Sequence, residues 1–106
     1  MNFKLNVITR LLLFNNMPEN GTIEKIINKR NVREKITFSS DELDKLQLKT
    51  DENGITFKPI DDIEVEFTNT EIKFLNDVME SISEKGLFVE ASLDFVLSLR
   101  DALKDK

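Results

Sequence analysis

The 106-residue chain contains no cysteine, no histidine, no tryptophan and no tyrosine. Without cysteine, neither a disulfide framework nor a thiolate metal site can form. Without histidine, the chain lacks the commonest general base and the commonest transition-metal ligand. We therefore expect a protein that is not an enzyme and that holds neither a metal ion nor a cofactor.

Glycine and proline are also scarce, with three and two copies. The glycines are isolated, so no glycine-rich loop is available to cradle a phosphate. No apolar run has the length of a membrane span, and the apolar stretch Leu11–Phe14 is short and has no signal-peptide cleavage site after it. We expect one compact domain over residues 1–106, in the cytoplasm and without membrane contact.

The clearest signals that are present mark a helix beginning after Thr68. Thr68 and Glu71 have the spacing of a capping box, and Phe67 and Ile72 have that of the accompanying hydrophobic staple. Gly86 is the natural end, because glycine accepts the left-handed conformation that closes many helices. Apolar residues at helical spacing predict one buried face, made of Ile72, Leu75, Val78, Met79 and Ile82.

A second helix should start near Phe88 or Val89 and run to about Leu103. Its apolar arc is about twice the 100° that one core contact requires. We predict that one side packs on the preceding helix through Val89, Leu93, Val96 and Leu103. Unless the first helix of the chain covers it, the other side should form a two-fold homodimer. The predicted self-association residues are Phe88, Phe95, Leu99 and Arg100, although the Arg100 head could instead simply reach water.

The first residues of the chain predict a strand followed by a helix. Asn2–Leu5 alternates, with Phe3 and Leu5 on one side. Asn6 is a good N-cap for the helix. The apolar face of this helix is assigned to Val7, Ile8, Leu11, Leu12 and Phe14, with Leu13 off that face.

A further helix is predicted to begin after Thr22, beyond a turn that contains Pro18 and Gly21. Later apolar residues do not continue its first apolar face, so we expect the helix to bend or end near residues 31–35. The residues predicted to point inward are Ile23, Ile26 and Ile27.

This helix is rich in basic residues. Lys25, Lys29 and Arg33 lie four residues apart and share a face. Together with Arg30 they are candidate contacts for phosphate or nucleic acid, since a basic helix after another helix is typical of a helix-turn-helix. The alternative is a solvated basic face that pairs with the acidic part of the chain. Residues 1–60 carry a net charge of +2 and residues 61–106 one of −7.

The middle of the chain predicts a short helix and a hairpin. Ser39 and Glu42 repeat the capping-box spacing, before a short helix over Ser40–Leu46. Asn53 and Gly54 then stand between two strand-like stretches, as in a tight β-hairpin.

Alternation continues after the hairpin and completes the predicted fold. Ile63, Val65 and Phe67 alternate with Glu64 and Glu66, which predicts a strand with one wet, acidic face. We predict an α+β fold, in which a small antiparallel sheet of two or three strands packs with four or five helices and the chain ends in a helical hairpin.

The order of these signals resembles a group of small uncharacterised proteins encoded by tailed phages and prophages. The resemblance covers about Leu5 to Leu99 and is carried by structural motifs. They include the Met17–Gly21 turn, the segment Arg33–Ser39 and the Asn53–Gly54 hairpin. The resemblance implies a phage accessory protein in the host cytoplasm and brings no assigned active-site residues.

We therefore expect a non-catalytic phage-type protein that binds another macromolecule, with a host defence or regulatory system as a candidate target. One alternative is a protein that binds nucleic acid or a phosphorylated small ligand through the basic helix at residues 22–35. A third is a structural subunit of an assembly.

Overall fold

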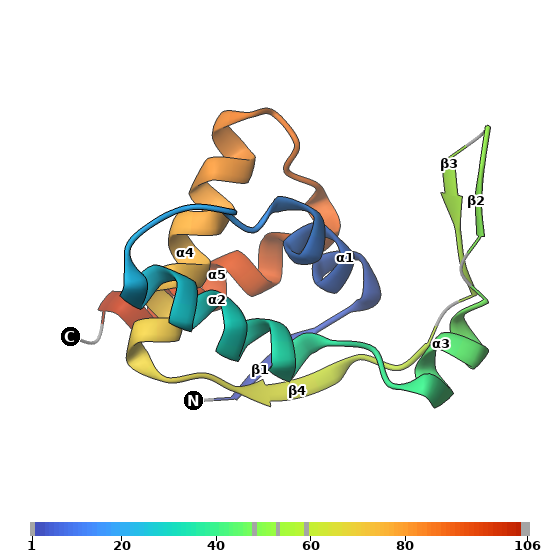
Figure 1. The fold of residues 1–106 in the computed structure, drawn as a ribbon, viewed down its shortest axis with the longest axis horizontal. Coiled ribbons are helices and arrows are strands. Elements are labelled where there is room, and N and C mark those ends of the chain that lie inside the picture. The colour runs from blue at the N-terminus through green and yellow to red at the C-terminus, as the bar shows by residue number, and fades with distance from the viewer. Residues whose placement is uncertain (1, 48, 53, 59, 105–106) are drawn as a thin grey trace.

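The computed structural model describes residues 2–47, 49–52, 54–58 and 60–104. Its α+β architecture, with five α-helices and antiparallel strand pairs, confirms the predicted fold class (Figure 1). Helices α4 and α5 contact each other at the C-terminal end, as the predicted helical hairpin requires. The elements are β1 (Asn2–Leu5), α1 (Val7–Asn16), α2 (Ile23–Ile36), α3 (Ser40–Leu46), β2 (Lys49–Asp51), β3 (Gly54–Thr56), β4 (Ile63–Glu66), α4 (Asn69–Glu84), the short 3-10 helix η1 (Glu90–Ser92) and α5 (Leu93–Lys104).

Strands β1 and β4 pair antiparallel and lie side by side along one edge of the body (Figure 1). Phe3 is opposite Val65, and both side chains are buried on the same face. The Phe3 ring lies 5.7 Å from that of Phe67 and 6.0 Å, edge to face, from that of Phe95 in α5. This aromatic cluster joins the strand pair to the last helix.

The predicted ends of α4 are confirmed. The Thr68 side chain accepts from the Glu71 N–H, and the Glu71 carboxylate accepts from the Thr68 N–H. At the other end Gly86 has φ +73°, and the Leu87 N–H donates to the Ile82 carbonyl oxygen at 3.1 Å. This left-handed closure satisfies carbonyls that the helix leaves free.

The last helix starts later than predicted and has a different rotation. The 3-10 turn η1 precedes it, and α5 begins only at Leu93. Phe95 and Leu99 are 5% and 0% exposed, whereas Val89 and Leu93, which we predicted to be buried, are 38% and 43% exposed. Strand β1 contacts α5 and covers the side that was expected to need a second chain.

Helix α1 is capped by Asn6 as predicted, but it buries other residues as well. The Asn6 side chain accepts from the Thr9 N–H at 2.8 Å. Leu13 is fully buried, so its predicted position off the apolar face is wrong, and Ile8 is exposed. Arg10 is buried too, because the start of α3 and the end of α2 close over it.

Helix α2 ends at Ile36, one residue beyond the stretch 31–35 where we expected it to bend or end. It packs on α4 with Val32 and Ile36 fully buried. These two residues are four apart and lie on one face. The opposite face carries Ile23, Ile26 and Ile27, which are exposed, so their predicted inward direction is wrong.

Beyond α2 the chain continues into the short helix α3 and a β-hairpin. The Ser39–Glu42 capping box is confirmed, and Gln47, the C-cap residue after α3, has φ 47°. The hairpin of β2 and β3 follows and projects away from the helices (Figure 1). Gly54 takes the positive φ expected at this turn, whereas Asn53 lies outside the described residues.

Candidate functional surface on helix α2

The side of α2 that faces away from α4 combines apolar and cationic side chains. Ile23 is 76% exposed and Ile27 is 51% exposed. Exposing large aliphatic side chains to water is unfavourable, and burying them against a partner lowers the free energy. Several such side chains on one helix face therefore mark a candidate interaction surface. We name this surface the α2 outer face, made of Ile23, Ile26, Ile27, Arg30 and Arg33.

An open hollow of about 460 Å³ adjoins the α2 outer face. Arg30 and Arg33 lie at its edge, and in the described chain neither forms an ion pair. Their guanidinium groups are therefore available to an acidic group on a bound molecule. The hollow is lined by Ile26, Lys29, Arg30, Arg33, Glu34 and Thr37.

Three of the four predicted phosphate contacts meet at this hollow. Lys29, Arg30 and Arg33 line it together. Lys25 does not, because it lies on the side of α2 that faces α4, where it lines a different hollow with Asp77. The predicted shared face of Lys25, Lys29 and Arg33 is thus divided between two parts of the surface.

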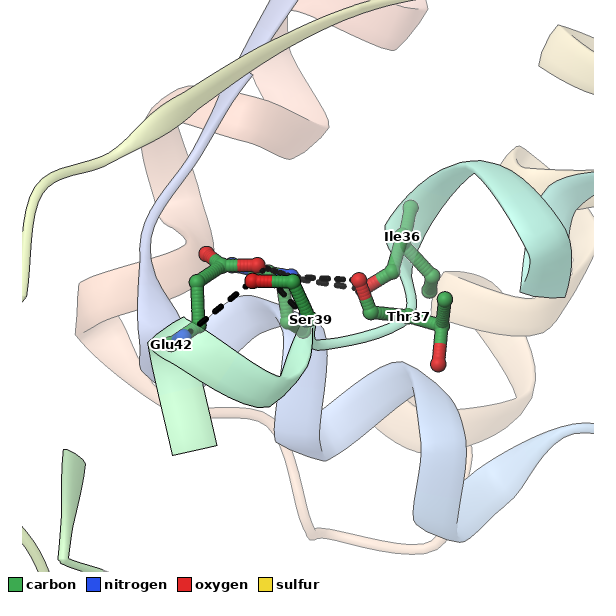
Figure 2. A network of polar contacts seen from close by, with 5 residues as sticks. Ile36, Thr37, Ser39 and Glu42 are labelled. Atoms are coloured by element: carbon green, nitrogen blue, oxygen red, sulfur yellow. Dashed lines mark hydrogen bonds and ion pairs between the residues drawn. The ribbon is translucent and has the colours of Figure 1, made fainter. Parts of the chain in front are cut away.

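A buried arginine fixes the C-terminal end of α2. Arg10 is 1% exposed and donates from Nε to the Ile36 carbonyl oxygen at 2.9 Å. It also donates from Nη2 to the Thr37 carbonyl oxygen at 2.8 Å. The Glu42 carboxylate accepts from Nη1 at 2.7 Å to Oε2 and from Nη2 at 3.1 Å to Oε1. Figure 2 shows Glu42 and Ser39 beside this end of α2.

The same contacts explain the strong acidity of Glu42. The hydrogen bond from Arg10 lowers the pKa of Glu42 from its usual 4.5 to about 2, and the Ser39 N–H adds to the effect. The Phe38 ring stacks over the Arg10 guanidinium at 3.9 Å and lies near the Phe14 ring. The guanidinium thus joins α1, α2 and α3, and it meets a carboxylate, two carbonyls and an aromatic face.

A second ion pair fixes the rotation of α2. Lys35 donates to Glu71 Oε1 at 2.6 Å and to the Glu66 carbonyl oxygen at 3.0 Å. Glu71 is buried, and the same oxygen caps the start of α4. Because Lys35 and Arg10 both hold the inner side of α2, the three isoleucines remain on the outside. Neither anchor was found by sequence reasoning, although an arginine within an apolar helix such as α1 is a usable signal.

The predicted self-association residues do not form one exposed patch. Phe95 and Leu99 belong to the core, and Phe88 is half-buried against it. Arg100 reaches solvent and pairs at 3.0 Å with Glu80 of the same chain. The expectation that Phe95 and Leu99 lie exposed on one patch is therefore wrong.

The main helix contacts differ from those of a helix-turn-helix. Helix α1 packs against α4 and η1, and α2 packs against α4. In a helix-turn-helix the two helices would instead pack on each other and present the second one to the DNA groove.

Other site types find no support in the residues from 2–47, 49–52, 54–58 and 60–104. These residues contain no cluster of three side chains that could hold a metal ion. No helix among them is both long enough and apolar enough to cross a bilayer. In comparisons with known proteins, no family model, curated protein or solved structure matches the chain.

Proposed function

We propose that this protein is a non-catalytic binding protein whose α2 outer face docks on another protein. The observation that carries the proposal is the exposure of Ile23, Ile26 and Ile27 beside Arg30 and Arg33. Protein interfaces commonly combine an apolar centre with arginines, and the apolar residues supply much of the driving force. The partner surface that fits best is an apolar strip edged by carboxylates.

The attachment of α2 supports a binding role because it holds the C-terminal part of the surface, which carries Arg30 and Arg33, in place before any partner arrives. Val32 and Ile36 are buried, and Arg10 and Lys35 hold the C-terminal half by hydrogen bonds. A surface that is already ordered loses less conformational entropy on binding. This arrangement favours recognition by a fixed helix face.

The resemblance to tailed-phage and prophage proteins adds a biological context to the proposal. In that context the partner is a host protein, and binding it counteracts a host defence or regulatory system. The lack of histidine and cysteine is consistent with action by binding, since it removes the usual catalytic and metal-ligating groups.

Affinity capture from host-cell extract tests the proposal if matched variants are used. Intact protein should retain a host protein at micromolar concentration or below. Ile23→Ser/Ile27→Ser should lose it, because the apolar centre of the face is gone. Leu43→Ser is the control, since Leu43 is an exposed leucine on α3, away from the face. A host protein retained equally by all three forms would contradict docking through α2.

Nucleic acid is the second candidate ligand, because Lys29, Arg30 and Arg33 converge on one hollow. One feature counts against nucleic acid, and another counts against a small phosphorylated ligand. Exposed isoleucines between the cations would lie against phosphates, whereas nucleic-acid interfaces are polar and strongly basic. The hollow is also too open to enclose a small phosphorylated ligand, which a typical pocket buries over most of its surface.

Gel shifts with duplex DNA, single-stranded DNA and RNA distinguish the two candidates. The protein-binding proposal predicts no retardation at low salt. If phosphates are bound instead, retardation should appear, should disappear in Arg30→Glu/Arg33→Glu, and should weaken with salt by a log–log slope of about −0.9 per duplex contact.

A further inference from the structure

A second exposed apolar surface lies on α5. Leu93 and Leu97 are 43% and 45% exposed and are four residues apart, so they lie on one helix face. Asp94 and Asp101 are exposed on the same helix, and in the described chain neither carboxylate forms an ion pair. We name this surface the α5 acidic face, made of Leu93, Leu97, Asp94 and Asp101.

The rest of the neighbourhood supports the acidic character of this surface. Glu90 is exposed in η1 directly before α5. Of the two cations in α5, Arg100 is already paired with Glu80, and the exposed Lys104 lies in the last turn, beyond both leucines. Leu87 and Val89 are also exposed just before η1 and extend the apolar area.

The two surfaces are complementary. The α2 outer face presents isoleucines edged by Arg30 and Arg33, and the adjoining hollow adds Lys29 and one acid, Glu34, so its balance is cationic. The α5 acidic face presents leucines edged by Asp94 and Asp101. The two surfaces are carried by different helices, and α4 contacts both of those helices. Both surfaces are exposed in the single chain, so they do not cover each other within it.

We propose that a second copy of this chain covers the α2 outer face with its α5 acidic face. This inference rests on the proposed function, because it assigns an additional occupant to the same surface. The contact joins two different surfaces, so copies associate head to tail instead of around a two-fold axis. The free chain thereby shields its exposed isoleucines, and a host partner has to displace the neighbouring copy.

Two properties of the association follow. It grows beyond a dimer as the protein concentration rises, because every added copy leaves one α2 outer face and one α5 acidic face open. It also weakens as salt is added, because its charged edges lie at the surface and are screened.

Sedimentation velocity on the intact chain and on two blocked variants tests this proposal. Ile23→Ser/Ile27→Ser blocks the α2 outer face, and Leu93→Ser/Leu97→Ser blocks the α5 acidic face. Intact protein should show an average mass that rises with concentration beyond a dimer. Each variant alone should remain monomeric, and circular dichroism should show that both are folded.

An equimolar mixture of the two variants gives the decisive result. Each variant keeps the face that the other has lost, so the mixture should form a one-to-one dimer and grow no further. Leu43→Ser should associate like the intact chain. The proposal is overturned if the intact chain is monomeric at all concentrations, if the mixture stays monomeric, or if either blocked variant alone still dimerises.

The outcome is separable from that of the proposed function. If the intact chain is monomeric while Ile23→Ser/Ile27→Ser still abolishes capture of a host protein, only the self-association is wrong. If head-to-tail association occurs while capture is unaffected by that variant, only host-protein docking through α2 is wrong.

Discussion

Replacing Glu42 by glutamine tests whether the buried Arg10 pair holds α2 in place. Glutamine retains an acceptor for the Ser39 N–H, as the capping box allows, but it removes the negative charge. Arg10 then keeps its bonds to the Ile36 and Thr37 carbonyls and loses its counter-ion. The substitution therefore isolates the contribution of the charge.

The size of the effect can be worked from the pKa of Glu42. A fall from 4.5 to about 2 corresponds by linkage to at most about 3 kcal/mol. The Glu42 side chain is 25% exposed, so solvent screening reduces the expected loss at pH 7 to about 1–2 kcal/mol. Because the folded-state pKa is the lower one, this stabilisation is complete above pH 4.5 and is lost as the pH falls towards 2.

Urea unfolding of the intact protein and of Glu42→Gln measures this contribution. The difference in unfolding free energy should be about 1–2 kcal/mol at pH 7 and should shrink steadily between pH 4.5 and pH 2. Glu34→Gln removes an exposed carboxylate on α2 that forms no ion pair among the described residues, and it should stay within about 0.5 kcal/mol of the intact protein. The reasoning is refuted if Glu42→Gln and the intact protein have the same unfolding free energy at pH 7. It is also refuted if the difference between them stays constant down to pH 2.

The remaining predictions also concern stability and are measured by denaturant unfolding. Val32→Ala should cost about 2–3 kcal/mol because it opens a cavity, whereas Ile23→Ala should change stability by less than about 0.5 kcal/mol; equal costs would contradict the rotation of α2. Phe67→Ala should cost about 3–5 kcal/mol through the lost aromatic cluster, and an unchanged midpoint would contradict its burial. Thr68→Ala should cost about 0.5–2 kcal/mol through the lost cap, and no change would contradict the capping box. Gly86→Ala should cost roughly 1 kcal/mol because of the positive φ, and a neutral result would contradict the helix closure.

Local signals in the sequence were sufficient to predict much of the fold. The capping boxes at Ser39–Glu42 and Thr68–Glu71 involve residues three apart, so they depend little on distant parts of the chain. The same holds for the closure at Gly86 and for the alternation that buries Phe3 and Leu5.

The rotation of α2 could not be predicted in this way. The helix carries apolar residues on two opposite sides, with Ile23 and Ile27 on one and Val32 and Ile36 on the other. Periodicity alone cannot choose between two such faces. Tertiary contacts decide, because Arg10 and its partners hold one side of the helix against the body.

The candidate site was predicted only in part for the same reason. Lys29, Arg30 and Arg33 were found because basic residues are evident in the sequence, and the structure brings them together. Phe95 and Leu99 were misassigned because the strand that covers them, β1, lies at the other end of the chain. Contacts between distant segments carry no local sequence signal.

Methyl NMR of isoleucine-labelled protein tests the central claim most directly, namely that the α2 outer face is the binding surface. The captured host protein is titrated into the labelled chain, and each isoleucine methyl signal reports its own surroundings. We expect the signals of Ile23, Ile26 and Ile27 to shift or broaden, while those of the buried Ile36, Ile72 and Ile82 stay in place. Binding that leaves the three outer isoleucines unchanged would contradict this claim.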